Sequence, residues 1–298
     1  MDAIPSPQAT PDIEPLACRF DPESRRDVAR TRASEIAVRG SLRAAALTAP
    51  LAARHARASI ARRWSQLLIS AARIDLRLSG RENIDPSRTY LVTPLHESFV
   101  DAPVVMSLPL RPVFTVRQEL LDHELFGGTL RRSGQIVVPD LRTPGSLRRF
   151  LEDTRTAQAA GFDIVVFPQG SVLGVEIAFE QGIGRLSRSL DLPILPVSIS
   201  GTHRVWGYPF DTTVRFGQRV DVAVLPPIEA RDASPERLRS AERHLKDTAL
   251  ESLAPVRRFN PDRDGWWDDY TFAIDHDYPH LAERMAAHRR QIIEPGQR

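Results

Sequence analysis

Two hydrophobic periodicities follow each other between residues 59 and 79. In SIARRWSQLLISAA (59–72), apolar side chains recur at helical spacing, while Arg62, Arg63 and Gln66 fall on the other side. The pattern then changes to alternation, with Ile74, Leu76 and Leu78 separated by polar residues. This change predicts an amphipathic helix followed by a strand, which Ser79-Gly80 ends.

Short apolar, β-branched runs continue along the chain at regular intervals. They are YLVT (90–93), VFTV (113–116), QIVV (135–138), DIVVF (163–167) and ILPVSI (194–199). Helical patterns separate them at about 118–132, 144–160 and 179–190, and a charged helix is predicted at 234–253. Two late strands within 212–225 are predicted to form a hairpin through Gly217-Gln218.

The alternation of strands and helices predicts an α/β fold with a mixed, largely parallel sheet flanked by helices. An N-terminal amphipathic helical segment precedes it. We expect four regions: a flexible tail (1–30), an amphipathic membrane-contact segment (31–73), a core (74–229) and a helical, aromatic appendage (230–298). The 298 residues are enough for one sizeable hydrophobic core.

Charge narrows the possible partners. The formal net charge is only +2, which gives no support for nucleic-acid binding over the whole surface. Val28 to Arg73, however, carries nine arginines and one acidic residue, a composition compatible either with an anionic membrane surface or with a solvated helix face. We find no secretory signal and no apolar run long enough to span a bilayer, so a cytoplasmic protein is expected. Cys18 is the single cysteine, which excludes an intrachain disulfide and a cysteine-based metal site.

The stretch LVTPLHESFVDAPVV (91–105) holds the first candidate chemistry. His96 follows a predicted strand, and Asp101 comes five residues later. On one continuous helix these side chains would point about 140° apart, so they meet only if His96 lies on the turn and Asp101 begins the helix. Pro103 in a first turn would fit, with Asp101 as N-cap. Then Asp101 could orient the imidazole, leaving its other nitrogen to accept a proton. Alternatively, Asp101 is only a cap and His96 only a loop histidine.

Two further loops follow predicted strands. In FPQGS (167–171), Gly170 allows unusual backbone angles and Gln169 offers both a donor and an acceptor, although an ordinary β-to-helix loop would look similar. The glycines around Ser171 do not match a nucleophile elbow. In LPILPVSISGTHRVW (192–206), Arg204 could face a substrate anion or be a surface arginine.

In this order and spacing, the blocks resemble the glycerolipid acyltransferases, the family of 1-acylglycerol-3-phosphate and lysophospholipid acyltransferases. HESFVD looks like the family's H-x-x-x-x-D block, and residues 116–140 look like the stretch through its second block. FPQGS is similar to the third block, and LPILPVSISGTH to the fourth. The resemblance runs from near Trp64 to about Pro227.

The resemblance implies a mechanism and a place of work. His96 would be the general base on an acceptor hydroxyl, assisted by Asp101, and the hydroxyl would attack a fatty acyl thioester on coenzyme A or acyl carrier protein. The acceptor would be a lysolipid, and no cofactor or metal is implied. Substrate contacts would come from Arg117, Arg204 and the block Pro168, Gln169, Gly170 and Ser171. The helical segment from Ile60 to Ala72 would lie on the inner face of the cell membrane.

Several positions depart from the family pattern. Leu95 stands in the usual asparagine position, Gln169 replaces a glutamate, and Val172 and Leu173 stand where arginine is frequent. Asp140 aligns with an arginine, although Arg142 is close. Because a phosphate monoester prefers bidentate arginine partners, we expect a less charged acceptor, such as a lysophospholipid, an aminolipid or a glycolipid. Arg117 and Arg204 could restore phosphate binding.

Two rival functions share the same residues. A thioesterase or lipase would use water as the acceptor in the same pocket. A non-catalytic membrane-binding protein would have lost activity through the altered blocks. The intact pair of His96 and Asp101 counts against the second rival.

Overall fold

A computed structural model describes residues 54–122, 127–140, 142–170, 178–206, 214–251 and 257–259. It also describes residues 21–22, 25–26, 28–30, 32–33, 36–37 and 40–41. The part of the predicted C-terminal appendage (230–298) that follows residue 259 lies outside these residues, as do the first 20 residues and Ser171. Within the described residues, no helix combines the length and the hydropathy needed to cross a bilayer.

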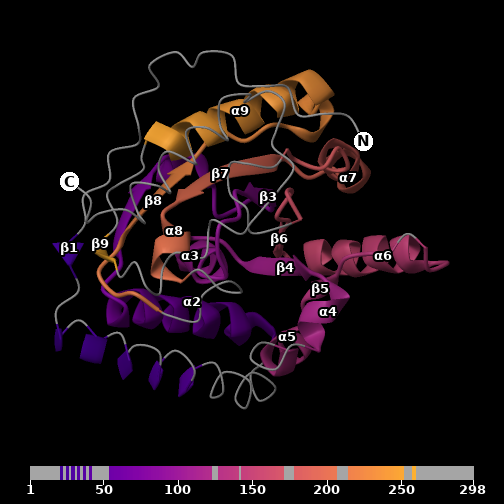
Figure 1. The fold of residues 1–298 in the computed structure, drawn as a ribbon. Coiled ribbons are helices and arrows are strands. Elements are labelled where there is room, and N and C mark those ends of the chain that lie inside the picture. Colours follow the sequence, from indigo (N-terminus) through magenta and orange to yellow (C-terminus); the bar gives the residue numbers. More distant parts are fainter. Residues whose placement is uncertain are drawn as a thin grey trace, which may run out of the picture.

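A mixed, mostly parallel seven-stranded sheet forms the centre of the described structure (Figure 1). Its strand order is β2-β8-β7-β3-β6-β4-β5, and β7 with β8 is the antiparallel pair. The strands are β2 (Asp75–Ser79), β3 (Leu91–Pro94), β4 (Pro112–Val116), β5 (Ile136–Val137), β6 (Asp163–Val165), β7 (Ile194–Ser200) and β8 (Arg219–Val224). A separate parallel pair joins β1 (Asp21–Pro22) to β9 (Arg257–Phe259). The predicted α/β class with a largely parallel sheet is confirmed.

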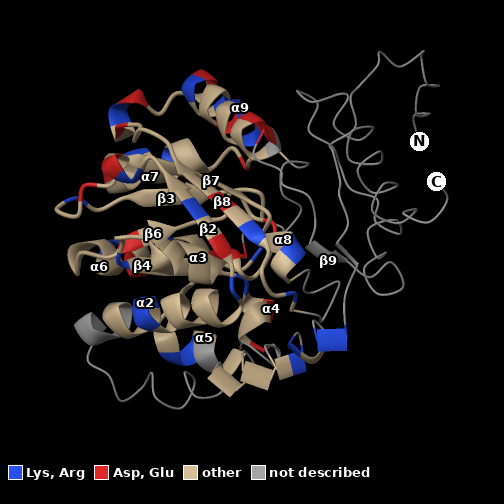
Figure 2. Cartoon of the chain, turned by 90° about the vertical axis from the view of Figure 1, so that its left-hand side faces the viewer, with Lys and Arg blue, Asp and Glu red and all other residues tan. Residues whose placement is uncertain are grey.

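Helices cover both faces of the sheet, because the buried strands alternate apolar side chains between two cores. On β3, Val92 belongs to the core beneath α2 (Arg54–Ala71) and α3 (Asp101–Ser107). Leu91 belongs to the core beneath α6 (Ser146–Ala159), α7 (Ile183–Leu190) and α9 (Pro235–Glu251). Charged residues gather on the outer helices, whereas the central strands carry few (Figure 2). The remaining helical turns are η2 (Arg81–Asn83), α4 (Gln118–Leu121), α5 (Gly127–Ser133), α8 (Thr202–Val205) and η4 (Ala230–Asp232).

Three predicted elements differ from the structure. The helix expected at 118–132 is divided into α4 and α5. The start of α5 lies so close to the carbonyl of Leu121 that a Cβ at Gly127 would be 2.1 Å from its oxygen, so a glycine is needed there. The helix expected from residue 179 begins at Ile183. The backbone N–H of Phe179 instead donates to Glu242 on α9, at 2.8 Å.

The predicted hairpin through Gly217-Gln218 is wrong. The N–H of Gly217 donates to the carbonyl of Ala72, and the carbonyl of Gln218 accepts from the N–H of Asp75, so this turn is hydrogen-bonded to the connection between α2 and β2. β8 pairs with β2 and β7, while Val214 forms an isolated bridge to Trp206.

Buried charge secures α9 to the rest of the fold. Lys246, the only lysine of the sequence, has a fully buried side chain, and its Nζ lies 2.8 Å from the Oε1 atom of Glu242. Arg239 donates to the other carboxylate oxygen at 2.6 Å. A buried carboxylate needs such partners, so these contacts fix both the helix and the backbone at Phe179.

Candidate active site

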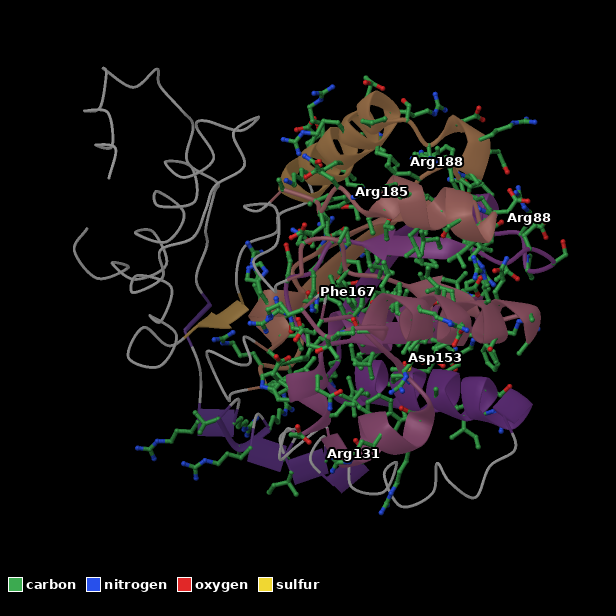
Figure 3. The ribbon with its side chains drawn as sticks, turned by 90° about the vertical axis from the view of Figure 1, so that its right-hand side faces the viewer. Arg88, Arg131, Asp153, Phe167, Arg185 and Arg188 are labelled. Atoms are coloured by element: carbon green, nitrogen blue, oxygen red, sulfur yellow. The ribbon has the colours of Figure 1, made fainter. Side chains whose placement is uncertain are left out.

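Four neighbouring parallel strands end at the same edge of the sheet, and the predicted site residues follow these ends. β3 leads to His96, β4 to Arg117, β6 to Phe167–Gly170, and β7 to Thr202–Arg204. Because parallel strands bring their carboxyl ends together, loops that are far apart in the sequence meet here. Phe167 is labelled near the middle of the fold in Figure 3, whereas Arg131 and Arg185 lie on the outer helices α5 and α7.

His96 and Asp101 form a hydrogen-bonded pair at the start of α3. The Nδ1 atom of His96 lies 2.7 Å from the Oδ2 atom of Asp101. The Asp101 side chain is fully buried, whereas that of His96 is 13% exposed. With Nδ1–H donated to the carboxylate, the Nε2 atom of His96 carries the lone pair that can accept a proton.

The Asp101 carboxylate is held by donors from two parts of the chain. Its Oδ2 atom also accepts from the backbone N–H groups of Glu97 and Ser98, at 2.7 and 2.9 Å. Its Oδ1 atom accepts from the hydroxyl of Thr202. The prediction that Asp101 is the N-cap is therefore wrong. Val100 occupies that position, and Asp101 is the first helical residue, with its side chain turned back to the preceding loop. The prediction that Asp101 begins the helix is confirmed.

The loop that follows β6 contacts both the ring and the backbone of His96. The Phe167 ring stacks on the imidazole with a centroid separation of 3.8 Å and an interplanar angle of 21°. Gln169 accepts the backbone N–H of His96 through Oε1 at 2.8 Å. Together these contacts fix the plane of the imidazole and the backbone that carries it.

The FPQG turn has the geometry that its sequence predicts. Gly170 adopts a φ of 63°, in the left-handed region that favours glycine. Pro168 and Gln169 are buried, and the carbonyl of Pro168 accepts from Glu180 at 2.8 Å. The Nε2 atom of Gln169 is buried without a hydrogen-bond partner in the described structure. A substrate or water oxygen could accept from it.

The two predicted arginines have different surroundings. Arg117 is exposed, and its Nη2 atom would lie 3.8 Å from a Cβ placed on Gly170, so its guanidinium is close to the FPQG turn. Arg204 is only 3% exposed, which rules out the interpretation as a surface arginine. Its carbonyl accepts from Arg215 at 2.9 Å. Asp140 and Arg142 pair with each other at 3.0 Å on the exposed loop before α6.

The sequence did not point to three residues that the structure adds to this region. Thr202 bonds Asp101 across 101 positions of sequence. Glu97 and His203 form a second histidine–carboxylate pair, with 2.8 Å between Nδ1 and Oε2. Glu97 follows His96 and His203 precedes Arg204, both predicted site residues, but no local pattern shows that β7 lies next to β3. The described residues contain no cluster of three or more His, Cys, Asp or Glu side chains suited to a metal ion.

Comparison with known proteins adds three findings. Residues 75–200 match the model of the family described as Acyltransferase. A 1-acyl-sn-glycerol-3-phosphate acyltransferase from Limnanthes douglasii is 24% identical over 189 residues, covering 60% of this chain and 64% of the relative. One from Cocos nucifera is 25% identical over 114 residues, covering 37% of each chain. The chain thus spans just under two thirds of the Limnanthes relative.

A solved structure shares the fold. The crystal structure of the 1-acyl-sn-glycerophosphate (LPA) acyltransferase PlsC from Thermotoga maritima matches with a TM-score of 0.61 and 22% identity, covering 76% of this chain and 96% of that one. The family match begins at β2 and ends at the last residue of β7, so it encloses the strands whose ends carry His96, Arg117 and Gln169. The family match and the curated relatives support a place for residues 75–200 among the glycerolipid acyltransferases.

Proposed function

We propose that the protein transfers a fatty acyl group from an acyl thioester to a hydroxyl of a lysolipid. The observation that carries this proposal is the 2.7 Å contact between the partly exposed imidazole of His96 and the buried carboxylate of Asp101. This pair stands at the carboxyl ends of parallel strands, where ligands bind in open α/β sheets. The named relatives are acyltransferases that act on a lysolipid, which supports the same chemistry.

The geometry suits general base catalysis. The Nε2 atom of His96 accepts the proton of the acceptor hydroxyl as its oxygen attacks the thioester carbonyl. The carbon–sulfur bond then breaks, and the imidazolium returns the proton to the departing thiolate. Asp101 stabilises the imidazolium while it exists, and the stacked Phe167 keeps the ring in one plane. The thiol carrier is coenzyme A or acyl carrier protein.

For the acceptor, we propose a lysolipid whose head group carries less charge than a phosphate monoester. Asp140 and Arg142 neutralise each other on the loop where the family pattern has an arginine. Arg117 is the exposed arginine beside the FPQG turn and is suited to one phosphate oxygen of a diester. The 1-acyl-sn-glycerol-3-phosphate of the relatives is the acceptor against which this preference is measured.

The test measures free-thiol release from a long-chain acyl thioester. Wild type and His96→Ala are each assayed with and without a lysolipid extract, and the lipids are identified by mass spectrometry. His244→Ala on the exposed side of α9 is the matched control, because it removes a histidine far along the chain from the site. We expect acceptor-dependent release that yields an acylated lipid, and a loss of about two to four orders of magnitude only in His96→Ala.

Other results would favour the rivals. Release without any acceptor, lost in His96→Ala, would replace the transferase with a thioesterase. Full activity in His96→Ala would reject the mechanism. A protein that binds vesicles but turns over neither acyl-CoA nor acyl carrier protein thioesters would point to the non-catalytic reading. Including 1-acyl-sn-glycerol-3-phosphate among the acceptors tests the head-group preference directly.

We also propose that α2 rests on an anionic membrane surface. Leu67 is 70% and Ile60 49% exposed on this helix, with Arg63 exposed beside them, while Leu68 and Ile69 pack into the core. An exposed apolar stripe flanked by arginine suits a lipid interface. Removing the whole segment would uncover the face of α3 beneath it, so a point substitution is the sharper test.

The membrane test compares Leu67→Gln with Leu147→Gln. Leu147 on α6 is 49% exposed and provides the same chemical change at another surface. We expect weaker sedimentation with anionic vesicles for Leu67→Gln alone, and weaker binding of wild type as salt rises. Equal sedimentation of both variants and wild type would reject α2 as the contact.

A further inference from the structure

Thr202 stands apart from the other partners of the catalytic pair. It comes from the loop after β7, whereas the remaining donors to Asp101 come from residues 96–98. We propose that Thr202 is a positioning residue that fixes the orientation of the Asp101 carboxylate, and through it His96. This inference rests on the proposed function and adds to it a residue outside the H-x-x-x-x-D block.

The distribution of donors over the carboxylate supports this role. Oδ2 accepts from His96 and from two backbone N–H groups, all of which approach from one loop. The Thr202 hydroxyl bonds Oδ1 on the other side. Rotation about the Cβ–Cγ bond moves both oxygens, so the three bonds at Oδ2 already oppose it, and the Thr202 bond adds the restraint at Oδ1. Asp101 and Thr202 are both fully buried, so water does not provide a ready substitute for the hydroxyl.

The backbone around Thr202 is itself fixed against the His96 loop. The N–H of Gly201 and the Nδ1 of His203 both lie 2.8 Å from the Oε2 atom of Glu97. Gly201 has a φ of 94°, and a Cβ at this position would lie 2.5 Å from the carbonyl of Arg219, so a glycine is needed there. Glu97, the neighbour of His96, thus holds the residues on both sides of Thr202.

The connection has a chemical consequence. If the hydroxyl is removed, Oδ1 becomes a buried acceptor without a donor, and the carboxylate can turn to seek another. The bond from Nδ1 of His96 then loses its fixed direction. Because a general base must reach the acceptor hydroxyl within hydrogen-bond distance, a small rotation of the imidazole lowers kcat while substrate binding is largely kept.

The experiment uses the full-length chain with three substitutions. Thr202→Val removes the hydroxyl at nearly constant volume, and Thr202→Ser retains it. Ser200→Ala is the matched control, because the buried hydroxyl of Ser200 bonds the carbonyl of Ala249 on α9, two residues from Thr202 and away from Asp101. Thermal unfolding confirms that each variant is folded before the other measurements are compared.

Two readouts are measured for each variant. The first is kcat and KM for acyl transfer. The second is the downfield proton resonance of the His96 Nδ1–H, assigned by its loss in His96→Ala, which reports the bond to Asp101 without substrate. We expect Thr202→Val to lose about ten- to a hundredfold in kcat with KM close to wild type, and to shift or broaden the resonance. Thr202→Ser and Ser200→Ala should resemble wild type in both.

The outcomes separate this inference from the proposed function. A wild-type kcat and resonance in Thr202→Val would overturn the role of Thr202 and leave the transferase in place. Equal losses in Thr202→Val and Thr202→Ser would also overturn it, because the methyl group rather than the hydroxyl would then matter. If wild type transfers no acyl group, the proposed function fails, and the resonance still decides whether Thr202 orients the pair.

Discussion

Two buried aspartates lie at opposite ends of the same parallel strands. Asp101 is at the carboxyl ends, where it accepts from His96, Thr202 and two backbone N–H groups. Asp163 begins β6 at the amino ends and accepts only backbone N–H groups, from Tyr90 at 2.9 Å and from Arg111 at 2.7 Å. Tyr90 and Arg111 immediately precede β3 and β4. One carboxylate thus orients a titratable side chain, and the other aligns three strands.

The difference teaches that burial of a carboxylate is not by itself a sign of catalysis. Both aspartates are almost completely removed from water, at 0% and 4% exposure. What distinguishes them is the identity of their partners. A carboxylate bonded to an imidazole at the carboxyl ends of the strands can assist proton transfer. A carboxylate bonded only to main-chain groups stabilises the start of the sheet.

The largest expected effect is a loss of kcat when the aspartate at the carboxyl ends of the strands, Asp101, is changed. Asp101→Asn should lower kcat by about two orders of magnitude or more, because a neutral amide cannot stabilise the imidazolium of His96. The fold should survive, since the amide oxygen can keep the backbone N–H groups while its NH2 group meets the Thr202 hydroxyl. Acyl-transfer kinetics and thermal unfolding measure both properties. Near-normal kcat in a folded Asp101→Asn protein would remove the functional half of the comparison.

The second effect concerns stability. Asp163→Asn should lower the free energy of unfolding by about 1–3 kcal/mol, because one backbone N–H of Tyr90 or Arg111 would face an amide NH2 instead of an oxygen. The remaining folded protein should have a kcat close to wild type. Chemical denaturation and kinetics normalised to folded protein check these points. A loss of kcat as large as that of Asp101→Asn would show that the two ends of the strands are coupled.

The smallest effect is a pH dependence of that stability difference. Burial raises the pKa of Asp163 above its ordinary value of 3.8, although the N–H groups of Arg111 and Tyr90 oppose this shift. A raised pKa means that the folded state binds the proton more tightly than the unfolded state, so the stabilisation is fully present below the ordinary pKa and is lost as pH rises through the raised one. The gap between wild type and Asp163→Asn should therefore be widest near and below pH 3.8 and should narrow as pH rises above this value. A gap that widens over this range would contradict the raised pKa.

The sequence predicts the strands well but not their neighbours. Alternation at Ile74, Leu76 and Leu78 and the runs at β3 to β7 correspond to observed strands, because local hydrophobic periodicity reflects burial directly. The hairpin prediction was wrong because Gly217 bonds the residue after α2, a partner about 145 residues away that no local pattern reveals.

The same division applies to the site. His96 and Asp101 are five residues apart, so the geometry of a turn leading into a helix was enough to predict the pairing as one of two interpretations. Thr202, Glu97 with His203, and Asp163 depend on the order of strands in the sheet, which the sequence left open. The roles of Arg117, Arg204 and Ser171 toward substrate stay predictions.

The buried pair on α9 offers a practical probe of motion in the protein. Lys246 is the only lysine in the sequence, and its amino group is enclosed with Glu242 beneath the helix. An amine-reactive reagent can modify this residue only when α9 opens, because the ammonium must leave its partner and reach solvent. The rate of labelling at Lys246, followed by mass spectrometry, therefore measures how often α9 opens. Comparing this rate with and without an acyl thioester tests whether the thioester reduces opening of α9 and so stabilises the backbone at Phe179, which shares the Glu242 carboxylate.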